Sequence, residues 1–220
     1  GWLPELRRFR LWQRFWRPDL PALRGVFRLG WPIGVTGLAE SGLFQASALM
    51  MGWIGTVELA AHGIAMEVAA LAFMVHLGLS NAITVRTAHF AGAGDPVALK
   101  RGARVGIALS AGFGITMVVL FLVLPGPLVG LFLDEGKPGT DEITAFAITL
   151  LALAALFQMG DAMQVIALGL LRGIKDTRVP MVMAAISYWL IGIPSSYLLA
   201  FPLGLGGVGL WLGLVIGLAA

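Results

Sequence analysis

Long apolar segments alternate with short polar ones along the chain. Continuous apolar segments lie at about 29–54, 63–85, 103–124, 143–171 and 179–201. A helix needs roughly 20 apolar residues to cross a hydrocarbon core about 30 Å thick, so these five segments are predicted to be transmembrane helices. A sixth apolar segment, 207–220, is too short to cross and is interpreted as a truncated sixth helix. These segments are continuously apolar and do not show the alternation of apolar and polar residues that is expected of the strands of a transmembrane barrel.

The composition supports a lipid environment. Hydrophobic residues make up 58% of the 220 positions and charged residues 12%, and the mean hydropathy is +0.88. Soluble domains carry about 25% charged residues. The absence of cysteine excludes disulfide, zinc-thiolate and thiol-nucleophile chemistry. We therefore predict an all-α membrane protein, a six-helix transmembrane bundle whose last helix is truncated.

The basic residues are distributed as in a membrane protein rather than a nucleic-acid-binding one, although the pI is about 9.8. Apart from Lys137, every Lys and Arg precedes the first segment or lies in the second or the fourth connection: Arg7, Arg8, Arg10, Arg14, Arg17, Arg24, Arg28, Arg86, Lys100, Arg101, Arg104, Arg172, Lys175 and Arg178. The positive-inside rule then predicts a cytoplasmic N-terminus in a multi-pass protein of the cell's inner (plasma) membrane.

Residues 1–24 are predicted to be a cytoplasmic linker, followed by a transmembrane domain at 25–220. Within the linker, aromatic and aliphatic residues at near-helical spacing are interleaved with arginines over 2–17. That pattern is typical of an amphipathic helix lying in the headgroup region. The missing initial Met and the apolar ending at Ala220 suggest a piece of a longer chain.

Three carboxylates lie inside the predicted spans, where ionisable groups are rare and costly. Glu40 follows Arg28 by twelve residues, and Asp161 precedes Arg172 by eleven. At 1.5 Å per residue both lie roughly 16–18 Å from the cytoplasmic boundary, near mid-membrane, whereas Glu67 is predicted near the outer rim. Glu40 and Asp161 are therefore the first candidates for a functional site, although a neutral, hydrogen-bonded carboxyl group is the alternative.

Polar residues accompany both mid-membrane carboxylates. Thr36, Phe44 and Ser47 recur with Glu40 on one helical face, and Gln158 and Gln164 flank Asp161 at i−3 and i+3. Such faces turn towards the bundle interior, where they line a cavity or form hydrogen bonds between helices. His62, His76 and His89 share no metal-binding spacing, so a zinc site is not expected.

Several of these segments resemble the multidrug and toxic compound extrusion (MATE) family. The resemblance is carried by the motifs LGWPIG before Glu40, AAHGIA at 60–65, GAGD at 92–95, QMGDAMQ at 158–164, GLLRGIKDT at 169–177, SYW at 187–189 and IP at 193–194. It covers nearly all of residues 25–220, and it implies the C-terminal half of a twelve-helix transporter with two lobes around a central cavity. The absent N-terminal lobe, the lipid bilayer and small-molecule drugs are the implied partners, and no nucleic acid is expected.

The resemblance also implies a function for the two carboxylates. Glu40 and Asp161 match the family's positions for the coupling cation, H⁺ or Na⁺, in an antiporter that exports amphipathic, often cationic compounds by alternating access. The auxiliary cavity or substrate contacts expected on this basis are Thr36, Phe44, Glu67, Phe157, Gln158 and Gln164. Phe157 stands where many relatives have Tyr, and Gly63 and Glu67 stand where many have amides, which favours H⁺ over Na⁺. No other cofactor and no enzymatic activity are expected.

Three alternatives stay open at this point. A lipid-linked sugar flippase has a related architecture, but it usually lines its cavity with basic residues, and the predicted spans contain no Lys or Arg apart from Arg104 at the very start of the third. An intramembrane hydrolase would need a partnered nucleophile or aspartyl dyad. No GxSxG motif is present, and the GxGD match at 92–95 lies in a connection between predicted spans and not inside one. A half-size subunit that dimerises to complete a cavity is the third.

Overall fold

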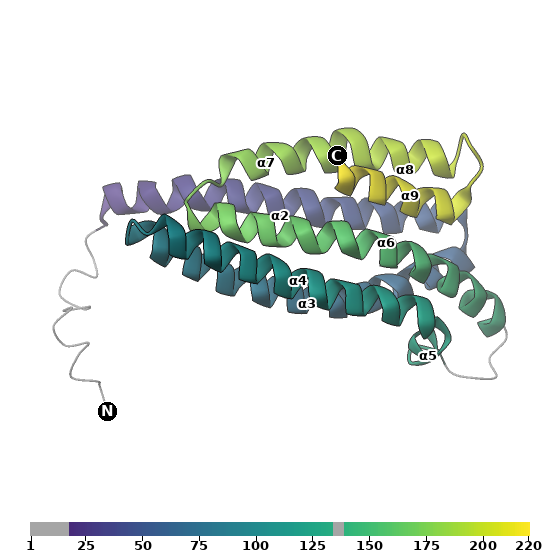
Figure 1. Ribbon diagram of the computed structural model, residues 1–220. Coiled ribbons are helices and arrows are strands. Elements are labelled where there is room, and N and C mark those ends of the chain that lie inside the picture. Colours follow the sequence, from purple (N-terminus) through teal and green to yellow (C-terminus); the bar gives the residue numbers. More distant parts are fainter. Residues whose placement is uncertain (1–17, 134–138) are drawn as a thin grey trace, which may run out of the picture.

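The computed structural model describes residues 18–133 and 139–220, and every regular element in these ranges is helical. The elements, drawn in Figure 1, are α2 (Leu20–Ile54), α3 (Thr56–Gly92), α4 (Pro96–Val123), α5 (Pro125–Gly130), α6 (Thr140–Gly173), α7 (Arg178–Ala184), the π-helix η1 (Ala185–Gly192), α8 (Ile193–Ala200) and α9 (Gly206–Ala219). The predicted all-α bundle is confirmed, and each predicted segment corresponds to one long helix or to the continuous run of α7, η1 and α8.

Four of the helical stretches are long and apolar enough to cross a membrane. They are α3, α4, α6 and the continuous stretch Arg178–Ala200. α2 has 35 residues but is less apolar, because Glu40 and Gln45 interrupt its apolar core. α9 has 14 residues and is correspondingly short. The polar interruption of α2 thus includes the candidate carboxylate Glu40.

The starts of two helices, α2 and α4, follow capping chemistry rather than hydropathy. α2 begins at Leu20 and not near residue 29, because Asp19 Oδ1 accepts a hydrogen bond from Ala22 N–H at 3.1 Å. Residues 20–24 of the predicted linker therefore belong to α2, while the predicted amphipathic helix at 2–17 lies outside the described residues. α4 likewise begins directly after Asp95, with Pro96 in its first turn. In these two helices the apolar segment marks the membrane core, whereas the capping side chain marks where the helix starts.

The fifth span contains a π-helix in place of a simple proline kink. η1 occupies Ala185–Gly192 and ends directly before Ile193 and Pro194, which begin α8. Proline lacks the N–H that an α-helix would use at this position, so local π-helical geometry can accommodate the lost bond. Short π-helical segments are frequent at functional sites, and this one packs against α2.

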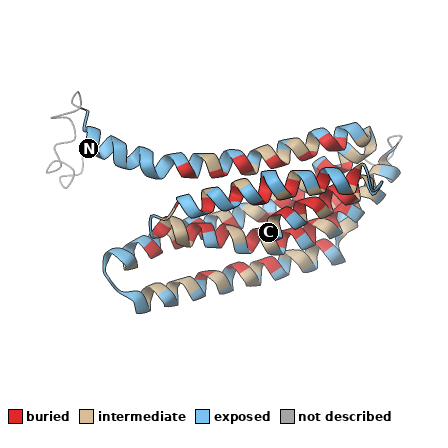
Figure 2. Ribbon diagram, turned by 90° about the horizontal axis from the view of Figure 1, so that it is seen from above, coloured by how far each residue is buried: buried red, intermediate tan, exposed pale blue. Residues whose placement is uncertain are grey.

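α3 and α6 form the centre of the bundle and have the most extensive mutual contact of any two helices (Figure 1). α4 covers one side of this pair, and α9 packs against α6, α8 and η1. Buried residues gather in this middle region, whereas the N-terminal part of α2 is exposed (Figure 2). The start of α2 and the α3–α4 and α6–α7 connections lie at one end of the bundle, so the basic residues in them share that end (Figure 1).

Candidate functional site

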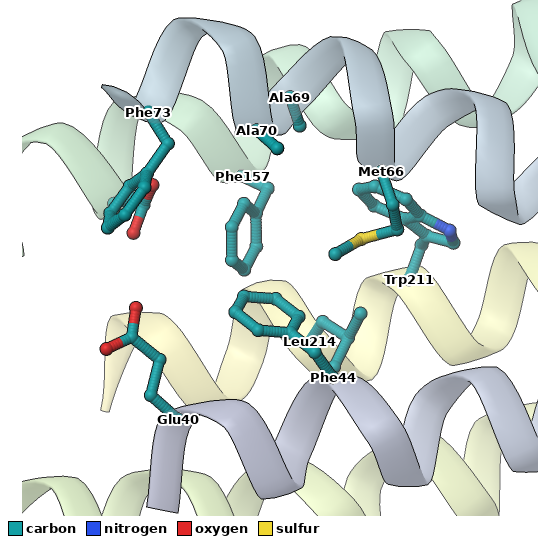
Figure 3. Close-up of a pocket in the computed structure, with 10 residues that line it drawn as sticks. Glu40, Phe44, Met66, Ala69, Ala70, Phe73, Phe157, Trp211 and Leu214 are labelled. Atoms are coloured by element: carbon teal, nitrogen blue, oxygen red, sulfur yellow. The ribbon is translucent and has the colours of Figure 1, made fainter. Parts of the chain in front are cut away.

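A pocket of about 140 Å³ lies between α2, α3, α6 and α9. Two acidic side chains, Glu40 from α2 and Asp161 from α6, contribute to its wall. The other lining residues are apolar: Phe44, Met66, Ala69, Ala70, Phe73, Phe157, Trp211 and Leu214. In Figure 3 the carboxyl group of Glu40 projects from α2 towards the side of the pocket formed by Phe73 and Phe157. We call this space the carboxylate pocket.

The two carboxylates come from helices that are far apart in the sequence. Asp161 is only 7% exposed, and Glu40 is half-buried. Their common pocket agrees with the equal depths estimated from the flanking arginines. An ionised carboxylate in apolar surroundings loses hydration that the surroundings do not replace, so such a group is stabilised by binding a proton or another cation. The pocket therefore has the chemistry of a cation-binding site.

Three aromatic rings form a continuous wall beside the carboxylates. Phe44 meets Phe157 edge to face with ring centroids 6.1 Å apart, and Phe157 meets Trp211 in the same way at 6.2 Å. Figure 3 shows the facing rings of Phe44 and Phe157, with Met66 and Trp211 further along the pocket. Edge-to-face pairs are favoured by the ring quadrupoles, so each ring limits the orientation of the next.

A buried histidine holds this wall in place. Trp211 Nε1–H donates to Nδ1 of His62 at 3.1 Å. Because Nδ1 accepts, the proton of the neutral ring lies on Nε2, which is 3.4 Å from Ser47 Oγ. The Ser47 hydroxyl in turn donates to the Phe44 carbonyl at 2.7 Å. These bonds tie α9, α3 and α2 together, and only a neutral His62 completes them.

The π-helix fixes α2 next to Glu40. Trp189 Nε1–H donates to the Ala39 carbonyl at 3.2 Å. The indole ring also lies over Gly42, where an added Cβ would come within 2.8 Å of Trp189 Cζ2. Because both contacts adjoin Glu40, a change in the geometry of η1 would shift the part of α2 that carries the Glu40 side chain.

The structure brings together half of the residues named from the sequence. Glu40, Asp161, Phe44 and Phe157 line the carboxylate pocket. Four others lie outside its lining: Thr36, Glu67, Gln158 and Gln164. Thr36 is buried and donates to the Pro32 carbonyl at 2.9 Å, and Glu67 is exposed. Gln158 is fully buried, and Gln164 is half-buried.

Sequence reasoning named Glu67 of α3 as a cavity contact, but it missed the residues of α3 and α9 that line the pocket. Met66, Ala70 and Phe73 are spaced as i, i+4 and i+7 and share one face of α3, next to the face of Glu67. Trp211 is the only aromatic residue of α9. A buried tryptophan in a short apolar helix needs a partner for its N–H, and this requirement was a usable signal.

A second buried polar cluster lies between α3, α4 and α6. His76 Nδ1 is 2.8 Å from Ser110 Oγ, and Ser110 Oγ donates to the Ala162 carbonyl at 3.4 Å. His76 Nε2 has no hydrogen-bond partner among the described residues, and neither have the two amide atoms of the buried Gln158 in α6. Unpaired buried polar atoms cost free energy, so the His76 cluster is incomplete where the His62 network is complete.

Comparison with known proteins identifies the family. The MatE family model matches residues 32–198, which include Glu40, Asp161 and η1. The chain belongs to the MatE family. It is 51% identical over 217 residues to a "Probable multidrug resistance protein NorM" of Rhizobium meliloti. The matched region makes up 99% of this chain and 46% of that protein. A protein of the same description in Agrobacterium fabrum is 47% identical over 215 residues, with 98% and 46% covered.

Solved structures show the same fold. The eukaryotic MATE transporter AtDTX14 superposes with a TM-score of 0.80 at 22% identity, over 90% of this chain and 44% of that one. An outward-facing multidrug resistance MATE transporter of the MOP superfamily gives a TM-score of 0.74 at 21% identity, over 88% of this chain and 42% of that one. The chain spans about half the length of the curated relatives it matches, as expected for one lobe of a MatE protein.

Proposed function

We propose that this MatE lobe is the cation-coupling half of a multidrug efflux antiporter in the cell's inner membrane. The observation that carries the proposal is the carboxylate pocket, in which Glu40 and Asp161 share an otherwise apolar and aromatic space. Relatives described as multidrug resistance proteins support the transport of drugs. The second half of the transport path belongs to the other lobe.

The pocket chemistry supports amphipathic, often cationic substrates. Phe44, Phe157 and Trp211 offer apolar surface and ring faces that attract cations, and the carboxylates offer negative charge. A buried carboxylate needs one neutralising partner, so the coupling cation and a cationic substrate compete for the same charge. Such competition is the thermodynamic basis of exchange: binding of one favours release of the other when the two facing states differ in affinity.

The donor set favours H⁺ over Na⁺ as the coupling ion. Apart from the two carboxylates, the pocket is lined by apolar side chains, including Phe157 at the position of a family tyrosine. α2 and α6 run as continuous helices through Glu40 and Asp161, so their carbonyls are engaged in helical hydrogen bonds. Sodium sites in transporters use unwound backbone carbonyls as ligands. A proton needs only the carboxylate itself.

The lining also weighs against a flippase for lipid-linked sugars. No Lys or Arg contributes to the carboxylate pocket among the described residues. A pyrophosphate-linked substrate would need cationic groups to replace its lost hydration. An acidic, aromatic pocket instead suits a cationic substrate.

Replacement of Asp161 by Asn tests the proposal. The variant keeps the size of the side chain but cannot exchange a proton, so gradient-driven efflux of a cationic dye from proteoliposomes should fall to background. The matched control is Asp141→Asn in the exposed first turn of α6, which should transport normally. Full retention of efflux in the Asp161 variant would refute the assignment.

A second measurement separates the coupling ions. Efflux by the wild-type protein should follow an imposed pH gradient and stay unchanged when a Na⁺ gradient of equal size is imposed or removed. Efflux that follows Na⁺ alone would replace the proton with Na⁺ in this scheme without affecting the role of the two carboxylates.

A further inference from the structure

The cytoplasmic end of α4, as oriented by the positive-inside rule, carries a basic pocket that is separate from the carboxylate pocket. It has a volume of about 400 Å³, and α4 alone supplies its lining: Pro96, Val97, Lys100, Arg101 and Arg104. The three cationic side chains are exposed and lie within little more than one helical turn. We call this space the α4 basic pocket.

The positive charge of this pocket resides in side chains and not in free helix-end N–H groups. Asp95 Oδ1 already accepts hydrogen bonds from Val97 N–H at 3.1 Å and Ala98 N–H at 2.9 Å. That carboxylate is held as the helix cap, and its one negative charge is outnumbered by the three positive charges that line the pocket. A ligand of this pocket must therefore be an anion that accepts hydrogen bonds from guanidinium and ammonium groups.

The same helix continues away from the pocket as an exposed apolar surface. Val105, Leu109, Ile115 and Val119 are each more than half exposed, at 53–56%. They lie in a helix that is long and apolar enough to cross a membrane, so hydrocarbon chains are their natural surroundings. A cationic group of residues at the membrane boundary is thus joined to an apolar track that leads into the bilayer core.

We infer that the α4 basic pocket binds the phosphate of an anionic phospholipid, whose acyl chains lie along the exposed face of α4. The charge selects an anionic headgroup, and the apolar track selects a lipid over a soluble phosphate. A zwitterionic lipid carries a cationic headgroup that the pocket repels, so it binds more weakly. The site does not depend on what the protein transports.

Native mass spectrometry of the purified protein, with whatever natural sequence flanks these residues, tests the site. Phosphatidylglycerol and phosphatidylcholine are titrated separately, and the dissociation constant of the tightest-bound lipid is measured. Removal of all three charges in K100Q/R101Q/R104Q should weaken phosphatidylglycerol binding by about 100-fold, given about 1 kcal/mol for each basic residue near an anionic headgroup. Phosphatidylcholine binding should stay unchanged.

Two matched variants make the result specific. R24Q/R28Q/K175Q removes one Lys and two Arg that are also exposed, at the same end of the bundle. It should change the dissociation constant less than about threefold, because the charge lies outside the pocket. The charge-preserving variant K100R/R101K/R104K should bind as the wild type does, which separates the loss of charge from misfolding. Equal weakening in the glutamine variants would overturn the site, because it would show a response to net charge alone.

Inorganic phosphate distinguishes a lipid site from a soluble-anion site. At millimolar concentration it should displace little phosphatidylglycerol, because it gains nothing from the apolar track. Complete displacement, or binding of phosphatidylglycerol no tighter than that of phosphatidylcholine, would overturn the proposal.

Discussion

Two regions of the bundle use polar residues in opposite ways. Where α3 meets α6, small polar residues and glycines let the helices approach closely; we call this region the α3–α6 seam, formed by Ser80, Thr84, Thr87, Gly169 and Gly173. The carboxylate pocket instead keeps an open space beside two acidic side chains. The first region has no room for a methyl group, and the second has room for a ligand.

The seam is held by direct hydrogen bonds between the helices. Ser80 Oγ donates to the Val165 carbonyl at 2.6 Å, and Thr84 Oγ1 lies 3.0 Å from the Gly169 carbonyl. A Cβ added at Gly169 would come within 2.7 Å of the Ser80 carbonyl oxygen. Small residues with hydrogen-bonding side chains are the usual means of helix association in lipid, where hydrophobic burial does not drive it. The seam is thus tightly packed and hydrogen-bonded, whereas the candidate site lies in the pocket.

The largest expected effect comes from breaking the seam. Gly169→Leu forces the backbone of α3 away from α6, so thermal unfolding of the purified protein should show a loss of about 3 kcal/mol or more. The control is Gly112→Leu on α4, where an added Cβ meets nothing within 4 Å. That variant should melt within a few degrees of the wild type. Equal melting temperatures for the two variants would mean that the seam is not tightly packed.

A smaller effect is expected at the hydrogen bond that holds the pocket wall. His62→Phe leaves the Trp211 N–H unpaired, and Trp211→Phe leaves His62 Nδ1 unpaired, so each should destabilise the fold by about 1–2 kcal/mol. The double variant should lose less than the sum, with a coupling of about 1 kcal/mol. His62→Phe combined with Ser110→Ala, which belongs to the His76 cluster, should instead be additive. Additivity in the first pair would show that the bond contributes nothing to stability.

The smallest effect, of opposite sign, is expected at Gln158. Its buried amide has no partner among the described residues, so Gln158→Met should leave the unfolding free energy unchanged or raise it by about 1 kcal/mol. Gln164→Met, at a half-buried position, is the control and should have no effect beyond about 0.5 kcal/mol. A clear destabilisation by Gln158→Met would show that this amide has a hydrogen-bond partner in the folded protein.

Much of the architecture could be predicted from the sequence, because lipid imposes few solutions. The helices occur where the apolar segments are, and the basic residues of the described ranges gather at one end of the bundle. The estimate of equal depth for Glu40 and Asp161 used only the rise per residue of a helix. By contrast, the start of α2 was misplaced because a helix continues past the apolar core to its cap at Asp19.

The candidate site was only partly predictable. Phe44 was named because it shares a helical face with Glu40, and Phe157 was named through the family resemblance, whereas Met66 and Trp211 come from helices that carry neither carboxylate. Glu67 was expected as a cavity contact, but it is exposed beside the pocket-lining face of α3. One residue of difference along a helix is a rotation of 100°, and local sequence does not fix that rotation here.

The sequence by itself determined the helical class, the positions of the helices and the one-sided distribution of basic charge, and it singled out Glu40 and Asp161. The tertiary structure alone decided which side chains share the pocket with them, through the Trp211–His62–Ser47 bonds and the contact of Trp189 with α2. The reason is physical: in lipid both the outer and the inner faces of a helix are apolar, so hydrophobic periodicity no longer marks the buried face. Packing of small residues and pairing of buried N–H groups then set how each helix is turned.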